Sequence, residues 1–215
     1  MIVTIDGPAG AGKSLVARML AERLGFRFLD TGAMYRAAAL AALRRNVDWN
    51  DESAVAAVVA AAKIESLPDR VLLDGEDVTQ AIRTVEITKL TRHTANNPQV
   101  RRHLVALQRH VVAAGNYVTE GRDQGTVAFP NAECKIFLVA SPEERARRRH
   151  RDLVARGETI ALEEVLAQQT ERDQSDSARA AGPLIAAPDA VEVNTDGLTP
   201  EQVVDKLVSV ARNKT

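Results

Sequence analysis

The sequence predicts an α/β protein built on a parallel sheet with helices on both faces. Near the N-terminus, short apolar runs alternate with segments of helical periodicity, an order that is typical of parallel sheets. A glycine-rich loop joins the first expected strand to the first expected helix. Farther along, the alternation stops and then resumes, which indicates a small insert within a chain of 215 residues.

The opening segment carries the clearest alternation. We expect a strand over 1–5, followed by a helix from Lys13 to Leu24 that Gly25 ends. A second strand is expected over 26–29 and a second helix over 32–44. Ligands bind at the carboxyl ends of the strands in such sheets, so the loops that follow these two strands are candidate sites.

The middle of the chain departs from this pattern. A helical segment over 51–62 precedes two short β-like runs, 64–67 and 71–73, which flank turn-rich residues and predict a small antiparallel insert. Two helices follow over 85–96 and 100–113, with Pro98 between them. We therefore place the core domain in 1–36 and 85–215, and the insert in 37–84 with a partial continuation to about 105.

The alternation then returns. Strands are expected over 117–119, 134–139 and 190–193, and helices over 161 to about 172 and over 200–212. Another helix begins after Ser141, which we expect to be the N-cap of a capping box that Glu144 closes, with Pro142 at the first helical position. This helix is expected to run to about Arg156.

Composition and charge exclude several classes of protein. Hydrophobic residues make up 45% and charged residues 27%, which excludes collagen-like and low-complexity chains. The net charge is −1, so no overall field draws the protein to nucleic acid or to an anionic membrane. No apolar run approaches the roughly 18 residues that a membrane helix needs. With one cysteine, Cys134, and no signal-peptide pattern, we expect a cytoplasmic location.

The glycine-rich loop is the strongest functional signal. Residues 7–14 match G-x-x-x-x-G-K-[ST] between an expected strand and an expected helix, the context that a P-loop requires. In a P-loop, backbone N–H groups surround a phosphate, the lysine reaches the β and γ phosphates, and the hydroxyl can ligate Mg²⁺. The expected nucleotide-binding residues are Gly7, Pro8, Ala9, Gly10, Ala11, Gly12, Lys13 and Ser14, with Ser14 as the metal ligand.

A P-loop indicates a nucleoside triphosphate but not its use. The guanine-reading tetrapeptide N-K-x-D is absent, and motor and AAA-type ATPases are longer chains, so we favour a small-molecule kinase. Such an enzyme needs an anion site for the acceptor and a lid that excludes water. Arg36 and Arg122 each follow an expected strand, which makes both candidates for the acceptor site.

Two later segments carry charge at helical spacing. The helix after Ser141 holds six arginines, and we expect most of them to be solvated, with Arg148 paired to Asp152, although one or two could close on ATP. A second charged stripe consists of Arg172, Asp173, Asp176 and Arg179. It could be exposed, or it could lie in the cleft beside the P-loop.

At these residues the sequence resembles the bacterial cytidylate kinases, which are nucleoside monophosphate kinases of the P-loop fold. The resemblance spans essentially the whole chain and rests on six ordered motifs. These are I-D-G-P with the P-loop over 5–14, D-T-G-A-M-Y-R over 30–36, G-E-D-V to I-R over 75–83, P-Q-V-R over 98–101, E-G-R-D-Q-G-T over 120–126 with F-P at 129–130, and R-D-x-x-D-x-x-R over 172–179 with P-L at 183–184.

The resemblance implies a three-layer P-loop fold with a parallel central sheet, a monophosphate-binding insert and a short helical lid over about 145–180. It also implies transfer of the γ-phosphate of ATP to CMP and dCMP in pyrimidine nucleotide metabolism, with Mg²⁺ as the cofactor. We expect a monomer whose partners are these small molecules, without nucleic acid or membrane.

The family pattern also implies roles for individual residues. It assigns the acceptor phosphate to Arg36, Arg122 and Arg179 with Thr31 nearby, the ribose to Arg172 and Asp176, and the base to Arg101 and Asp123. Cytosine suits the last pair, because its amine donates to a carboxylate while its O2 and N3 accept from a guanidinium. Arg148 is the candidate for the ATP side of the lid, and Lys13, Arg122 and Arg179 are expected to act in catalysis.

Two positions depart from the family pattern. Arg92 stands where the family usually has a small hydroxyl residue in the base pocket, and 174–175 lack a basic residue found in some relatives. Thr91 or Thr94 could replace the hydroxyl, Arg92 could pair with a carboxylate, or base selectivity could differ. Two alternatives stay open: a P-loop kinase of another acceptor such as UMP or AMP, and a non-catalytic nucleotide-binding regulatory protein.

Overall fold

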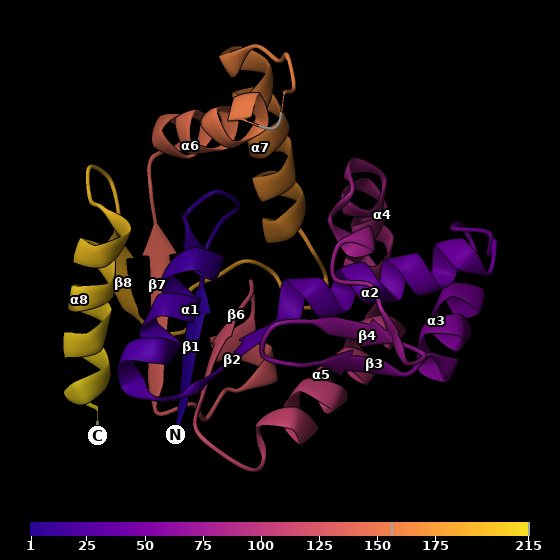
Figure 1. Ribbon diagram of the computed structural model, residues 1–215, viewed down its shortest axis with the longest axis horizontal. Coiled ribbons are helices and arrows are strands. Elements are labelled where there is room, and N and C mark those ends of the chain that lie inside the picture. Colours follow the sequence, from indigo (N-terminus) through magenta and orange to yellow (C-terminus); the bar gives the residue numbers. More distant parts are fainter. Residues whose placement is uncertain (156, 215) are drawn as a thin grey trace. The chain divides into compact units, whose positions relative to one another are not determined.

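The computed structural model describes residues 1–155 and 157–214 and divides into two compact units. The first unit consists of Met1–Phe26 and Asn116–Thr215, and the second of Arg27–Gly115. A five-stranded central sheet has the order β2-β6-β1-β7-β8, and a three-stranded sheet has the order β3-β4-β5 (Figure 1). The expected α/β class, with a parallel sheet and a small antiparallel one, is confirmed.

The first unit contributes four strands of the central sheet. They are β1 (Ile2–Asp6), β6 (Tyr117–Glu120), β7 (Cys134–Val139) and β8 (Val191–Asn194). Strand β1 pairs in parallel with β6 and β7, and β7 pairs in parallel with β8. Both β1 and β7 are almost entirely buried, and Cys134 has no exposed surface. The carboxyl ends of these strands therefore meet at one edge.

Two helices of this unit lie against each other beside the sheet. They are α1 (Lys13–Leu24) and α8 (Pro200–Arg212), and each has the expected bounds. Gly25 ends α1 with a left-handed φ of 68°, a conformation that glycine adopts without strain. The sequence missed one short π-helical turn, Gln124–Ala128, which follows β6.

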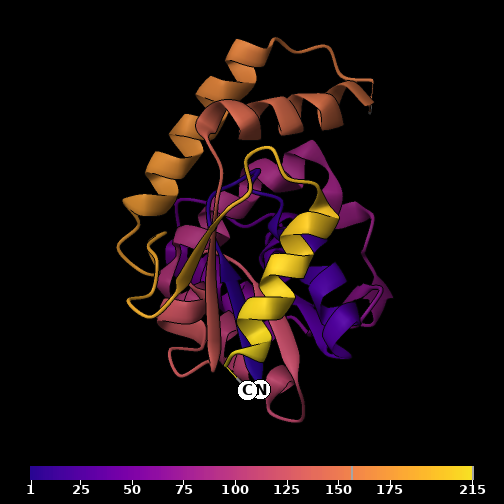
Figure 2. The same cartoon turned by 90° about the vertical axis from the view of Figure 1, so that its left-hand side faces the viewer.

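Two further helices of the first unit, α6 (Pro142–Ala155) and α7 (Leu162–Ser177), occupy the segment where the lid is expected, and we call them the lid helices. They lie against each other (Figure 2). A small apolar cluster that contains Ala146, Leu153 and Val165 joins them. Helix α7 runs beyond the expected end at about residue 172, so it carries both Asp173 and Asp176. The expected end of α6 at about Arg156 lies outside the described residues.

The capping box expected at the start of α6 is only half formed. The Ser141 hydroxyl accepts the Glu144 N–H at 3.3 Å, as expected. The Ser141 N–H, however, donates to the Asp196 carboxylate at 2.9 Å, and the Glu144 carboxylate binds the arginine one turn farther along the helix. The prediction that the Glu144 side chain accepts the Ser141 N–H was therefore wrong, because the carboxylate of Asp196, which is distant in the sequence, accepts it instead.

The second unit is built around helix α2 (Thr31–Arg44), which follows β2 (Arg27–Asp30). Its alanine-rich middle is almost entirely buried, and it contacts α3 (Glu52–Ala61), α4 (Val85–Asn96), β3 (Ile64–Ser66) and β4 (Val71–Leu73). Strand β5 (Glu76–Asp77) and the 3₁₀ turn Ala81–Arg83 were not expected. Pro98 is the first residue of α5 (Pro98–Val112), not a spacer between helices, because Asn97 caps that helix.

No helix in residues 1–155 and 157–214 is both long enough and apolar enough to cross a membrane.

Candidate functional site

The P-loop leaves the sheet at a point where only glycine fits. Gly7 has a φ of 145°, and a Cβ atom there would lie 2.1 Å from the Leu138 carbonyl oxygen on β7. At the other end, Gly12 has a φ of 86° and is the N-cap of α1. The strand, loop and helix therefore follow one another as the motif predicts, and the positive end of α1 faces the loop.

Lys13 lies across its own loop. The side chain is 5% exposed, and its Nζ donates to the Pro8 carbonyl oxygen at 2.7 Å. Burial and, second to it, the positive charge of Arg122 lower the pKa of Lys13 to about 7, whereas the Glu120 carboxylate acts in the opposite direction. A phosphate in the loop would favour the charged ammonium and so raise this pKa.

Ser14 and Glu120 together offer oxygen ligands for a metal ion. The Ser14 hydroxyl donates to Glu120 Oε1 at 2.7 Å, and Glu120 is 6% exposed at the end of β6. Mg²⁺ commonly binds through one or two protein oxygens together with water and substrate phosphates, so this pair fits it. Glu120 was not among the predicted site residues, although its place in the E-G-R-D motif after a buried strand could have indicated a role.

Asp6 holds the turn that follows β6. It is 4% exposed, and its carboxylate accepts the N–H groups of Gln124 at 2.8 Å and Gly125 at 2.7 Å. Burial raises the pKa of Asp6 to about 6, against the effect of these two hydrogen bonds, and the nearby Asp123 carboxylate adds to the increase. Asp6 therefore fixes the segment that carries the predicted site residues Arg122 and Asp123.

Three predicted site residues from two motifs meet at the end of α7. Asp176 accepts from Arg122 Nε at 2.8 Å and from Arg179 Nη2 at 2.5 Å. Burial alone would raise the pKa of Asp176, but Arg122 and Arg179 outweigh it and hold the pKa below its usual value, with a further contribution from Arg172. Two guanidinium groups on one carboxylate leave a positive charge that suits an anion.

Arg148 lies beside the P-loop, where the lid was expected to reach ATP. A Cβ atom on Gly12 would be 4.0 Å from Arg148 Nη1. The guanidinium donates to Glu144 at 2.9 Å, to Thr195 Oγ1 at 3.0 Å and to the Thr195 carbonyl at 2.7 Å. The expected pairing with Asp152 was therefore wrong, because Glu144 lies one turn earlier on the same helix.

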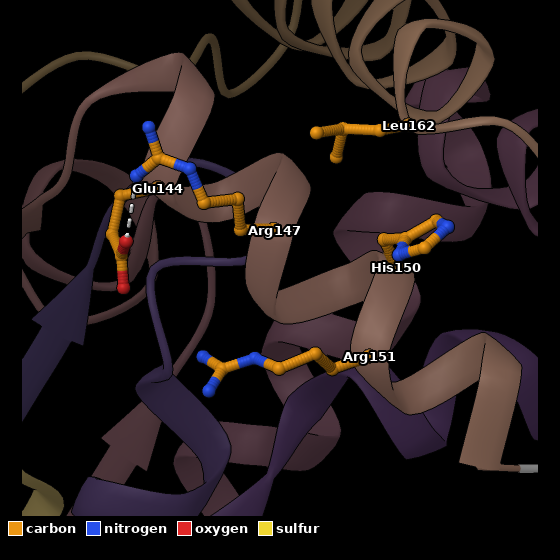
Figure 3. Close-up of a pocket in the computed structure, with 5 residues that line it drawn as sticks. All are labelled: Glu144, Arg147, His150, Arg151 and Leu162. Atoms are coloured by element: carbon orange, nitrogen blue, oxygen red, sulfur yellow. Dashed lines mark hydrogen bonds and ion pairs between the residues drawn. The ribbon is translucent and has the colours of Figure 1, made fainter.

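The other side of α6 faces solvent, but the expectation that most of its arginines are solvated is wrong: of the five that the structure describes, only Arg147 and Arg151 are exposed. A cavity of about 420 Å³ lies on this side, and Figure 3 shows its lining residues, which come from α6 and the start of α7. These residues are Glu144, Arg147, His150, Arg151 and Leu162. The Arg147 side chain is 58% exposed and pairs with Glu144 at 3.2 Å. The face of α6 on which an arginine lies therefore separates Arg145 and Arg148, beside the P-loop, from Arg147 in solvent.

In the second unit, the predicted site residues Thr31 and Arg36 lie on the first turns of α2. Asp30 is the N-cap of this helix and accepts the Ala33 N–H at 2.7 Å. Arg36 reaches the same carboxylate at 3.5 Å with a side chain that is 26% exposed. Thr31 is 2% exposed. Arg36 is therefore held in place and not fully solvated.

Arg101, the predicted base contact on α5, is 5% exposed. Its Nη1 donates to the Ala95 carbonyl at 3.2 Å, and its guanidinium carbon lies 5.6 Å from the centroid of the Tyr35 ring. A buried guanidinium over an aromatic ring keeps a fixed orientation, which a residue that reads a base requires.

The residues around Arg92 depart from the expected base pocket. The Thr91 hydroxyl donates to the Ile87 carbonyl at 2.6 Å, and the Thr94 hydroxyl donates to the Tyr35 carbonyl at 3.1 Å. Arg92 itself is exposed and lines a cavity of about 270 Å³ together with Trp49, Glu52, Val55, His93, Asn96 and Asn97. Both hydroxyl protons are therefore already used by the backbone of this unit.

Comparison with known proteins gives a full-length match. A family model described as cytidylate kinase matches residues 3–213. The chain is 48% identical over 212 residues to a cytidylate kinase from Rhodopirellula baltica, covering 99% of this chain and 93% of that one. It is 49% identical over 212 residues to a cytidylate kinase from Pelotomaculum thermopropionicum, with 96% and 94% covered. A solved shikimate kinase from Bacteroides thetaiotaomicron shares the fold, with a TM-score of 0.53, 16% identity, and 99% and 98% covered.

Proposed function

Because the chain belongs to the cytidylate kinase family, we propose that it transfers the γ-phosphate of ATP to CMP and dCMP, giving ADP with CDP or dCDP. Within the structure, one observation carries the proposal. Arg122 and Arg179, from separate motifs, meet on Asp176, and the charge of Arg122 also acts on Lys13 of the P-loop. A kinase of phosphorylated acceptors needs such positive charge next to its nucleotide loop, because two phosphate groups must approach each other.

On the ATP side, we assign the phosphates to the P-loop backbone and to Lys13, and the lid contact to Arg148. Ser14 and Glu120 would hold Mg²⁺, and without a metal Glu120 accepts a hydrogen bond from the Ser14 hydroxyl. Bound Mg²⁺ would offset part of the negative charge of the phosphates. The contribution of the protein is to place these groups in advance, so that little reorganisation is needed during transfer.

On the acceptor side, we assign the phosphate of CMP to Arg36, Arg122 and Arg179, with Thr31 nearby, as the family pattern implies. Arg172 and Asp176 take the ribose, and Arg101 and Asp123 take the base. The acceptor oxygen is already an anion, so the reaction needs no general base. The chemistry of this half of the site is therefore orientation and charge neutralisation.

We further propose that the protein works as a cytoplasmic monomer in pyrimidine nucleotide metabolism. A single, fully buried cysteine suits a reducing compartment, and a net charge of −1 gives no general attraction to nucleic acid. Size-exclusion chromatography with light scattering tests the monomer.

A coupled assay of ADP release with CMP, dCMP, UMP and AMP tests the function. We expect CMP and dCMP to be phosphorylated and UMP to be a poor acceptor. In UMP, O4 would face the Asp123 carboxylate and N3–H would face the Arg101 guanidinium. Two such mismatches at ~1 to 3 kcal/mol each give roughly 30-fold to 10⁴-fold discrimination in kcat/KM.

The panel also separates the alternatives. ATP binding without turnover of any acceptor would indicate a regulatory protein, and equal use of UMP and CMP would overturn the base assignment while leaving a monophosphate kinase. Asp123→Asn introduces an amide that can donate to O4 of UMP. It should narrow the ratio of kcat/KM between CMP and UMP, mainly by lowering activity on CMP.

A further inference from the structure

The lid helices bind the backbone of Ala9, at the tip of the P-loop, through both its N–H and its carbonyl. The Ala9 N–H donates to Asp173 Oδ1 at 3.3 Å, and the Ala9 carbonyl accepts from Arg145 Nη1 at 2.9 Å. Arg145 also donates to Asp173 Oδ2 at 2.5 Å. Ala9 and the Arg145–Asp173 ion pair thus form a closed ring of hydrogen bonds.

This ion pair is mostly removed from water. The Arg145 side chain is 7% exposed and the Asp173 side chain 19% exposed. Arg145 Nε also donates to the Ala140 carbonyl at 3.1 Å, which fixes the plane of the guanidinium. Arg147, two positions farther along α6, is 58% exposed, so the burial of Arg145 is specific to its face of the helix.

A third lid residue packs on the next residue of the loop. Gln169 is 7% exposed, lies one helical turn before Asp173 on α7, and donates from Nε2 to the Arg145 carbonyl at 3.3 Å. A Cβ atom on Gly10 would lie 2.7 Å from Gln169 Nε2 and 3.1 Å from Arg145 Cβ. Gly10 has a φ of 79°, so this glycine meets both the conformational and the spatial requirement.

We propose that Arg145, Gln169 and Asp173 form a P-loop clamp, through which the lid helices keep the loop tip in the conformation that receives the phosphates of ATP. The Ala9 N–H belongs to the Pro8–Ala9 peptide group and the Ala9 carbonyl to the Ala9–Gly10 peptide group. Each group is planar, so holding both of them restricts the φ and ψ angles of Ala9 and with them the backbone that leads into the phosphate-binding N–H groups. The three residues are positioning residues that act through the loop. Only the identity of the nucleotide rests on the proposed function.

The first test replaces each member of the ion pair conservatively. Arg145→Lys cannot bind the Ala9 carbonyl and Asp173 with the same forked geometry, and Asp173→Asn removes the charge. We expect ATP binding, measured by calorimetry, to weaken by about 10-fold to 100-fold, as hydrogen bonds to charged groups do when lost. In the same two variants, KM for CMP should change less than about threefold. The control Arg147→Lys, on the exposed side of α6, should leave both values unchanged.

A second variant separates positioning from general stability. Asp173→Asn leaves the Arg145 charge buried without its carboxylate and should lower the melting temperature, whereas Arg145→Met with Asp173→Leu removes both charges. We expect the double variant to recover the melting temperature but not the ATP affinity. If ATP affinity returns together with the melting temperature, the pair is only structural and the clamp is refuted.

A third readout does not depend on turnover. Amide hydrogen exchange over residues 9–13, measured without nucleotide, should be faster in Arg145→Lys and in Gln169→Leu than in the unmodified protein. Unchanged exchange together with unchanged ATP affinity would overturn the proposal. If the unmodified protein binds ATP but phosphorylates no CMP, the proposed function fails, while ATP affinity and amide exchange still decide the clamp.

Discussion

Two carboxylates on helix α7 lie within one turn of each other, yet their surroundings carry different charge. Asp173 is bound by one guanidinium, Arg145, and by one backbone N–H, so its pair is balanced. Asp176 is bound by two guanidinium groups, Arg122 and Arg179, and feels a third charge from Arg172. The first cluster is neutral and the second is positive.

Under the proposed function, this difference separates scaffolding from substrate binding. A balanced pair has its charge compensated inside the protein and serves to hold backbone in place. A carboxylate shared by two guanidinium groups gathers positive charge around it, which is what a phosphate site requires. Lys13 belongs to the second class, because its pKa is lowered by burial and then by repulsion from Arg122.

The largest expected effect comes from removing a member of the positive set. Lys13→Ala should lower kcat by about 10³-fold or more, since the charge that develops on the transferred phosphoryl group loses its closest cation. The melting temperature should not fall, because a buried positive charge is removed. Lys206→Ala, at an exposed position of α8, is the control. A Lys13→Ala enzyme with near-normal kcat would contradict the P-loop assignment.

The next prediction compares the two clusters directly. Arg179→Ala should lower kcat/KM for CMP by about 100-fold, the loss of a charge-assisted phosphate contact, while the melting temperature changes little because Asp176 keeps Arg122. Arg145→Ala instead leaves Asp173 without its guanidinium and should cost roughly 1 to 3 kcal/mol of unfolding free energy. Chemical denaturation and steady-state kinetics on both variants provide the test. The reverse pattern would refute the division into neutral and positive clusters.

The pH dependence of ATP binding sharpens the same comparison. With a pKa of about 7 in the ligand-free protein, Lys13 is charged below pH 7 and increasingly neutral above it. ATP phosphates favour the charged form, so binding takes up a proton above pH 7 and weakens by up to about tenfold per pH unit. Calorimetry in buffers of different ionisation enthalpy measures the proton, and Lys13→Arg should abolish the uptake. Equal affinity at pH 7 and pH 9 would show that Lys13 stays charged.

The same group affects stability in a defined direction. The unfolded lysine keeps a pKa near 10.5, so between pH 7 and about 10 the unfolded chain binds more protons than the folded one. The contribution of Lys13 to the unfolding free energy of the ligand-free protein therefore increases with pH over this range.

The smallest expected effect concerns the sugar. Asp176→Ala should reduce kcat/KM for both acceptors, because Arg122 and Arg179 lose their shared carboxylate. If the carboxylate also binds the ribose hydroxyls, kcat/KM should fall about threefold to tenfold more for CMP than for dCMP, which is the effect of one hydrogen bond. Equal losses would leave Asp176 as a holder of arginines only.

The sequence predicted those features that depend on local pattern. The bounds of α1 and α8, the P-loop between strand and helix, and the antiparallel pair formed by β3 and β4 all follow from periodicity and turn residues. Strand β5 was missed because two residues carry no periodicity. Helix α7 is longer than predicted. Its final turns are polar and carry no apolar stripe that the sequence could reveal, and tertiary ion pairs stabilise these turns.

The candidate site was predictable as a set of residues but not as a set of contacts. The sequence predicted a helix with six arginines after Ser141, yet it could not show that Arg145 would bind the Ala9 carbonyl while Arg148 reaches Thr195. Such partners lie far away in the sequence, and only the packing of the lid brings them together. The roles of Asp6 and Glu120 also depend on segments that meet only in the folded sheet.

Cys134, the single cysteine of the chain, makes the opening of the central sheet measurable by chemistry. It lies on β7 with no exposed surface, and burial raises the pKa of its thiol to about 11. Such a thiol is neutral and shielded, so a disulfide reagent can label it only after the strand separates from its neighbours. The labelling rate of the native protein therefore reports one structural event at one site, without an engineered probe. A bound nucleotide that stabilises the folded state should slow this rate in proportion to its saturation.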